Sequence, residues 1–151
     1  MHAWHRFRLT VIAVVSGAML GGCAQLPEPE GEPEPAVVEE IDGTDLHRIT
    51  LSARAAQRLG IETVAAETIA VEGSAGDRLV IPSSALFYTS DGGTWAYANP
   101  EPLVFERAGI DLDYVAGDLA VLRSGDADMV VVTIGAAELF GAESGLGAGG
   151  H

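Results

Sequence analysis

Lysine is absent from this 151-residue sequence, and cysteine occurs once, at Cys23. A single thiol cannot form an internal disulfide, so burial and backbone pairing must hold the fold together. Eight arginines stand against 22 acidic residues, which gives a formal charge of -14. A surface this acidic repels phosphate backbones and anionic head groups. We therefore expect no nucleic-acid partner and no basic patch for membrane binding.

Long hydrophobic runs are also scarce, and the first lies near the amino end. The twelve mostly apolar residues of Leu9–Leu20 follow Arg6 and Arg8, with no acidic residue before them. A run of this length is too short to cross a bilayer as a stable helix. The basic start and the apolar run predict a secretory signal peptide over residues 1–22.

The only cysteine stands directly after that run. Leu20-Gly21-Gly22-Cys23 resembles the lipobox of bacterial lipoproteins. The resemblance implies cleavage between Gly22 and Cys23 and a diacylglycerol on the Cys23 sulfur, which would anchor the chain in the lipid bilayer. An ordinary signal peptide with an incidental cysteine is the alternative. Ala24 stands where many inner-membrane lipoproteins carry aspartate, so we expect an extracytoplasmic, membrane-anchored protein, at the outer membrane if the host is Gram-negative.

Proline and glutamate dominate the next segment. From Ala24 to about Glu40 the prolines repeat without hydrophobic periodicity, which forbids a helix and favours an extended, polyproline-like path. We expect residues 23–44 to hold the acylated cysteine and a linker, and residues 45–144 to form the folded domain. The glycine-rich residues 145–151 are expected to be a flexible tail.

A strand, a capped helix and a second strand are expected at the start of the domain. Asp45–Ser52 alternates between apolar and polar residues, as a strand does. Ser52 is a good N-cap, Ala53–Leu59 are strong helix formers, and Gly60 can take the left-handed conformation that ends a helix. Ile61–Glu72 alternates loosely and is rich in β-branched residues, which predicts one further strand.

The rest of the domain is expected to be mainly strands. One strand ends at Pro82, hairpins cross the turns at residues 91–93 and 117–118, and residues 103–115 form one strand. Residues 128–135 are a nearly continuous apolar strand that we expect to be covered on both faces. A short helix over residues 136–144 closes the domain. These elements, six or seven strands with two short helices, predict a mainly β (α+β) fold, a small roll or barrel.

Short motifs recur along these expected strands and turns. They are Ile81-Pro82 with Ala85, the Asp91-Gly92 turn before Trp95, Phe105 in the next strand, and the Gly125–Val132 pattern leading to Gly135-Ala136. Residues 79–147, which contain them, resemble the carboxy-terminal, membrane-proximal domain of the periplasmic adaptor subunits, or membrane fusion proteins, of resistance-nodulation-division (RND) efflux systems. Residues 49–67 similarly resemble the opening segment of heavy-metal-type adaptors, which lies beside that same domain.

The chain lacks the central domains of a full adaptor. A full adaptor inserts a β-barrel, a lipoyl-like domain and a helical hairpin between these two segments, whereas here residues 72–78 join them. The heptads that a helical hairpin needs are missing from the sequence. The resemblance therefore implies contact with an inner-membrane pump, which the membrane-proximal domain helps to make. It does not imply contact with an outer-membrane channel, which the hairpin tip makes.

Candidate reactive residues are few. His47 and His151 lack the spacing of a zinc site, and Met129 lies in an apolar strand, where we expect it in the core. Ser83 and Ser84 follow a proline in an expected turn and lack the pattern around a nucleophilic serine. We therefore assign no catalytic, cofactor-binding or metal-ligating residue and expect no enzyme.

Aromatic residues cluster on neighbouring expected strands: Phe87, Tyr88, Trp95, Tyr97 and Phe105. Most are expected to pack across strands, and one or two exposed rings could anchor a partner.

Two functions fit the sequence. The first is a non-enzymatic, lipid-anchored, adaptor-like accessory protein that associates with an RND-type efflux transporter. The alternative is a free-standing extracytoplasmic lipoprotein that binds a small ligand or a metal in a pocket of the roll.

Overall fold

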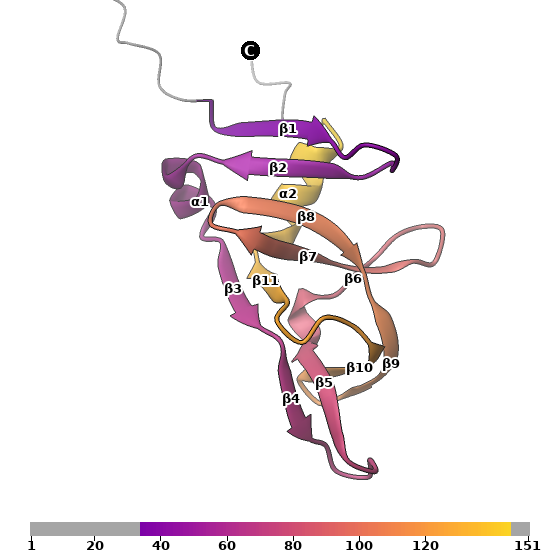
Figure 1. Ribbon diagram of the computed structural model, residues 1–151. Coiled ribbons are helices and arrows are strands. Elements are labelled where there is room, and N and C mark those ends of the chain that lie inside the picture. The colour runs from indigo at the N-terminus through magenta and orange to yellow at the C-terminus, as the bar shows by residue number, and fades with distance from the viewer. Residues whose placement is uncertain (1–33, 146–151) are drawn as a thin grey trace, which may run out of the picture. The chain divides into compact units, whose positions relative to one another are not determined.

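The computed structural model describes residues 34–145. The chain divides between Glu32 and Pro33 into two units, and the described residues all belong to the second. Figure 1 shows their strands and helices. The expected signal peptide, the Cys23 acylation site, the first half of the expected linker and most of the expected tail lie outside the described residues.

Eleven strands in residues 34–145 form two sheets, and every strand pair is antiparallel. Sheet A has the order β1-β2-β8-β7-β11-β3, with β6 paired to β7. Its strands are β1 (Ala36–Glu40), β2 (His47–Leu51), β3 (Glu62–Ala65), β6 (Phe87–Tyr88), β7 (Thr94–Glu101), β8 (Val104–Gly109) and β11 (Val130–Ile134). Sheet B has the order β4-β5-β10-β9. Its strands are β4 (Glu67–Ala70), β5 (Asp77–Pro82), β9 (Asp111–Ala116) and β10 (Leu119–Ser124).

The two sheets are joined by bends at buried apolar residues. Ala66 separates β3 from β4 and is 8% exposed, and Ile110 separates β8 from β9 and is 9% exposed. Each residue belongs to the apolar cluster between the sheets, so the chain turns a corner there and changes sheet. The expectation of one continuous strand over residues 61–72, and of another over residues 103–115, is therefore wrong. The alternating pattern runs through each corner without marking it.

The central strands of sheet A are covered on both faces. Along β7, Ala96 packs in the cluster between the sheets, and the next residue, Tyr97, packs in a second cluster beneath the helices. Val131 and Val132 of β11 divide in the same way, and both are 0% exposed. Successive residues of a strand point to opposite faces, so an apolar run is buried on both. The expectation for residues 128–135 is confirmed at Val131 and Val132, whereas the strand itself is shorter, Val130–Ile134, and Ile134 is 49% exposed.

The first helix, α1 (Ala53–Leu59), forms where its caps predict it. The Ser52 Oγ accepts a hydrogen bond from the Ala55 amide at 3.2 Å. Gly60 ends the helix with φ 64°, in the left-handed region that glycine enters at little cost. Both caps depend on residues adjacent in sequence, which is why the sequence alone predicts them.

The folded domain begins earlier than the sequence predicts. Ala36–Glu40 forms β1, which pairs with β2 in a register running from Ala36 opposite Leu51 to Glu40 opposite His47. The expected linker over residues 23–44 therefore overlaps the domain, and the expected start at residue 45 is wrong. Val37 and Val38 favour a strand, but the preceding Pro-Glu repeats hide that preference in the average composition.

The second helix, α2 (Ala136–Glu143), lies against sheet A (Figure 1). A short 3-10 turn, η1 (Ser83–Ala85), joins β5 to β6. The mainly β class with two short α-helices is confirmed, and both sheets remain open at their edges. Within residues 34–145, neither helix has the length and apolar character needed to span a membrane.

Candidate functional site

An open groove lies between β6 and α2. Its volume is about 610 Å³. Seven residues line it, four from β6 and the turn after it and three from α2: Phe87, Tyr88, Thr89, Ser90, Ala136, Ala137 and Phe140. None of the seven carries a charge. We refer to this cavity as the β6–α2 groove.

Aromatic rings form much of the groove surface. The Phe87 ring stacks on the buried Tyr97 ring at 5.4 Å between centroids, and it lies 5.9 Å from the Phe140 ring. Tyr88 is 64% exposed and Phe140 is 38% exposed. Tyr97 and Phe105 are buried in the core, as expected for packing residues. Of the five aromatic residues that the sequence singles out, Tyr88 is therefore the exposed ring that could anchor a partner.

The β6 side of the groove is fixed by the turn that follows it. Phe87 stands opposite Trp95, and the Trp95 Nε1 donates a hydrogen bond to the Thr89 hydroxyl at 3.0 Å. The Asp91 carboxylate accepts from the Gly93 amide at 3.5 Å. The Thr89 side chain and the Gly93 amide, which stand beside this carboxylate, hold the pKa of Asp91 below its ordinary value. An ionised carboxylate therefore stands next to a residue of the groove.

The α2 side of the groove is fixed by a buried carboxylate at the end of the helix. The side chain of Glu143 is 4% exposed, and its Oε2 accepts a hydrogen bond from the Tyr97 hydroxyl at 2.5 Å. Its Oε1 lies 3.1 Å from Arg107 Nη2 and 3.7 Å from His47 Nδ1. Arg107 also stacks over the Trp95 ring, 4.8 Å from its centroid. The network ties α2 to β2, β7 and β8.

The phenol of Tyr97 stays protonated in this network. Burial is the main cause that raises its pKa far above the ordinary value, and the hydrogen bond to Glu143 adds to it. A protonated phenol donates to the carboxylate, and Arg107 supplies the opposite charge. The His47 Nδ1, the Arg107 Nε and the Glu143 Oε1 are buried with no hydrogen-bond partner. The hydrogen bond from Tyr97 and the ion pair with Arg107 hold Glu143, and with it α2, in place. The Glu143 side chain is buried, which leaves little access for a substrate.

The structure does not bring the candidate catalytic residues together. His47 faces Glu143, whereas Ser83 and Ser84 belong to η1, where the Ser83 amide donates to the Asp118 carbonyl. Among residues 34–145, no hydrogen bond joins either serine hydroxyl to His47, and no three metal-ligating side chains cluster. Met129 packs against the core as expected. Cys23, Gly22 and His151 lie outside the described residues.

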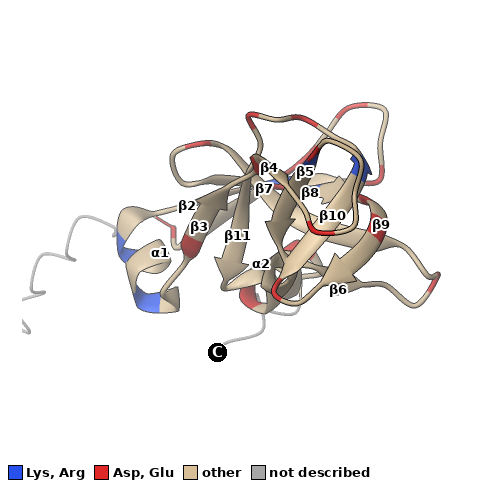
Figure 2. Cartoon of the chain, turned by 90° about the horizontal axis from the view of Figure 1, so that it is seen from below, with Lys and Arg blue, Asp and Glu red and all other residues tan. Residues whose placement is uncertain are grey.

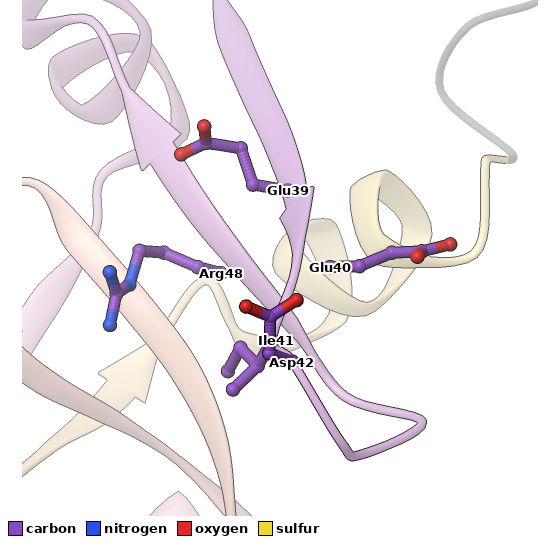
Figure 3. Close-up of a pocket in the computed structure, with 5 residues that line it drawn as sticks. All are labelled: Glu39, Glu40, Ile41, Asp42 and Arg48. Atoms are coloured by element: carbon purple, nitrogen blue, oxygen red, sulfur yellow. The ribbon is translucent and has the colours of Figure 1, made fainter.

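A second cavity, of about 240 Å³, lies at the end of β1 (Figure 3). Figure 3 shows the Glu39 and Glu40 side chains pointing to opposite sides of the strand, with Asp42 apart from both. Arg48 donates to the Glu106 carboxylate at 2.6 Å, and that hydrogen bond is the main cause that raises the pKa of Arg48. Since the carboxylates diverge and the arginine is already paired, the cavity offers no convergent set of ligands.

The β6–α2 groove is the better candidate site. Its lining side chains are aromatic, small and apolar, or hydroxylated, and none carries a charge, a composition that suits the binding of a small molecule. Sequence reasoning missed Phe140 as part of the site, and it named the neighbouring Asp91 only as a turn residue. The available signal was the pair Leu139-Phe140, since adjacent apolar residues on a helix cannot both face the core. Leu139 is 0% exposed, and Phe140 faces the groove.

The chain was compared with protein-family models, curated proteins and solved structures, and none of the three comparisons gives a match.

Proposed function

We propose that the chain is a non-enzymatic, lipid-anchored accessory protein that docks on an RND-type efflux transporter and acts in export across the membrane. The observation that carries the proposal is the pairing of the two segments with adaptor-like sequence. Residues 49–67 supply β3 and most of β2, and these pair with β11 and β8 from residues 79–145. This pairing is what the resemblance implies for a membrane-proximal domain.

The short joint between the two segments also supports the proposal. β4 and β5 form a hairpin, with Ala70 opposite Asp77 and Glu67 opposite Val80. Full adaptors carry their barrel, lipoyl-like and hairpin domains at this joint. In this chain the β4–β5 hairpin stands in their place, and the proposal assigns the domain contact with the pump rather than with an outer-membrane channel.

The proposal places the chain at the membrane through Cys23. An acylated Cys23 would hold the domain close to the bilayer, and the Pro-Glu segment would separate the two. Because the chain has no lysine and a formal charge of -14, its own surface supplies no electrostatic membrane attachment. The lipid would therefore be required for the protein to stay beside a membrane-embedded partner.

Affinity purification from host membranes tests this function. The native chain with a carboxy-terminal tag is solubilised in mild detergent, and the recovered proteins are identified by mass spectrometry. We expect an RND-type transporter to be recovered with the wild-type chain and depleted with Cys23→Ser. Recovery of the acylated chain without any transporter would contradict the proposal.

A free-standing binding lipoprotein is the second candidate function. The β6–α2 groove favours it, because a volume of about 610 Å³ suits a small ligand. A neighbouring gene for a transporter of the RND class would favour the first function. A ligand-induced rise in melting temperature, together with purification that recovers no transporter, would favour the second.

A further inference from the structure

The β6–α2 groove is larger than two other cavities of residues 34–145. It holds about 610 Å³, whereas the cavity at the end of β1 holds about 240 Å³ and the one between α1 and α2 about 130 Å³. Small-molecule sites have volumes of roughly 300–1,000 Å³. Of these three cavities, the groove alone therefore has room for a ligand of several fused rings.

The groove presents aromatic faces to whatever enters it. Phe87, Tyr88 and Phe140 line it, and Tyr88 and Phe140 are substantially exposed. The face of an aromatic ring carries partial negative charge, so it attracts a flat ring by stacking and a cation by electrostatics. The hydroxyls of Tyr88 and Ser90 add polar groups to the lining without adding charge.

The charge around the groove is negative. The ionised Asp91 carboxylate stands beside Thr89, which lines the groove. Arg107 is the arginine whose charge acts on Asp91, and it is already paired with Glu143. Acidic residues are spread over the turns and strand ends of the domain (Figure 2). A cation is therefore favoured in this groove and an anion is disfavoured.

The other arginines near the sheets do not offset this field. Each of three holds an acidic partner within 4 Å: Arg48 with Glu106, Arg78 with Asp113, and Arg123 with Asp111. Even with every arginine paired to an acidic residue, the chain keeps a formal charge of -14. The negative potential of the domain therefore adds to the effect of Asp91 at the groove.

The walls of the groove are held before any ligand arrives. Phe87 is fixed by its stacking on Tyr97, and the Thr89 turn is fixed by the hydrogen bond from Trp95. The α2 wall is fixed by Glu143. Preformed walls lower the entropy cost of binding, because few side chains must become ordered.

We propose that the β6–α2 groove is a binding site for an aromatic organic cation, with the ring system stacked among Phe87, Tyr88 and Phe140 and the positive charge at the end of the groove where Thr89 adjoins Asp91. This inference goes beyond the proposed function, which assigns no ligand to the domain. Binding is a property of this chain alone, so it does not depend on docking to a transporter.

Three probes of similar shape test the charge preference. They are N-methylacridinium, acridine and an acridine carboxylate, which are respectively cationic, neutral and anionic at neutral pH. The protein is the full chain with Cys23→Ser, which removes the acyl anchor and leaves every described residue unchanged. By titration calorimetry at low ionic strength, we expect the cation to bind about tenfold more tightly than the neutral probe, and the anion most weakly.

Matched substitutions test the location of the site. Asp91→Asn should weaken the cation about threefold and leave the neutral probe unchanged, because it removes only the charge. Tyr88→Leu should weaken the cation by a similar factor, because it keeps an apolar side chain and removes the π face. Asp118→Asn, in the β9–β10 turn, and Tyr114→Leu, on β9, are the matched controls and should leave both affinities unchanged.

Equal affinity for the three probes would overturn the proposal, and so would undetectable binding of the cation. Cation binding that Asp91→Asn and Tyr88→Leu leave unaltered would also overturn it, since the site would then lie elsewhere. Circular dichroism of each variant shows that the fold is retained. These results are independent of transporter recovery, so this inference and the proposed function can fail separately.

Discussion

At the scale of single residues, Glu143 has the most consequences for the candidate site. Its buried carboxylate meets the Tyr97 hydroxyl and the Arg107 guanidinium, and it ends the helix that forms one wall of the groove. A buried ion pair adds little stability over an apolar pair of the same shape, but breaking it leaves the remaining charge buried and unpaired. The position of α2 therefore depends on this carboxylate.

Glu143→Gln should lower the free energy of unfolding by about 3 kcal/mol, because Arg107 then loses its counter-charge in a site that is 18% exposed. The measurement is urea denaturation followed by circular dichroism. Glu138→Gln on the exposed face of the same helix is the control and should change stability by less than about 0.5 kcal/mol. Equal effects of the two substitutions would show that the Glu143 network does not hold α2.

Asp113 is expected to make the free energy of unfolding depend on pH in the acidic range. The Arg78 guanidinium donates to its Oδ2 at 2.8 Å, and this hydrogen bond is the main cause that lowers the pKa of Asp113 in the folded state. A lowered pKa means that the stabilisation is complete above the ordinary pKa of 3.8 and is lost as the pH falls through the folded value. Asp113→Asn should therefore flatten the dependence of the unfolding free energy on pH below about pH 4.

Denaturant titrations at a series of acidic pH values measure this effect, with Asp118→Asn as the control for removing one exposed carboxylate. A variant whose stability falls in acid as steeply as that of the wild type would contradict the role of the Arg78–Asp113 pair.

At the scale of elements, local signals predict the helices and tertiary packing decides the strands. The caps of α1 are adjacent to the helix in sequence, and they form as expected. The division of residues 61–72 into β3 and β4 depends on where Ala66 is buried between the sheets, and its amide bonds to the Met129 carbonyl, far away in sequence. A pattern of alternating residues holds no information on that contact.

The β6–α2 groove was beyond sequence reasoning for the same reason. Its walls come from residues 87–90 and 136–140, which only the fold brings together. The aromatic residues could be picked out as a set, because they stand on neighbouring strands, and Tyr88 was among them. Which ring is exposed depends on the place of α2, and the sequence does not fix that place.

Gly135→Ala tests how α2 is positioned at its start. Gly135 has φ 98°, and a Cβ there would lie 2.1 Å from the Ile61 Cδ1. We expect a loss of about 1–2 kcal/mol of stability from the left-handed backbone, with a shift of Ile61. Gly141→Ala in the same helix meets no atom within 4 Å and should stabilise by about 0.5–1 kcal/mol. Thermal and urea unfolding measure both, and a gain from both substitutions would contradict the strained start.

Removing β1 tests the corrected domain boundary. A chain that begins at residue 41 loses the pairing of Ala36–Glu40 with β2, whereas one that begins at residue 33 keeps it. We expect the shorter chain to be less stable by about 2 kcal/mol or more, because hydrogen bonds of the β1–β2 ladder are lost and Leu51 is uncovered. Equal urea midpoints for the two chains would place the boundary after β1.

At the scale of the whole molecule, we expect a lipid anchor and an acidic spacer in front of the mainly β domain. The sequence predicts the anchor and spacer from local composition, and the structure places the start of the domain at β1. We propose docking from the pairing of the two adaptor-like segments and ligand binding from the lining of the β6–α2 groove.

Acylation of Cys23 is the first prediction at this scale. Cells grown with radiolabelled palmitate should incorporate label into the wild-type chain, and Cys23→Ser should abolish it and release the exported protein from the membrane fraction. Gel fluorography and fractionation measure the two effects. Equal labelling of wild type and variant would contradict the lipoprotein assignment.

Cross-linking in intact cells tests the central claim most directly. Since the chain has no lysine, a reagent directed at carboxylates should be used, and its 22 acidic residues give ample attachment points. The account predicts cross-links, identified by mass spectrometry, between residues 34–145 and the periplasmic region of an RND-type transporter. Cross-links from the acylated chain to other proteins, with none to a transporter that is present in the same membrane, would contradict it.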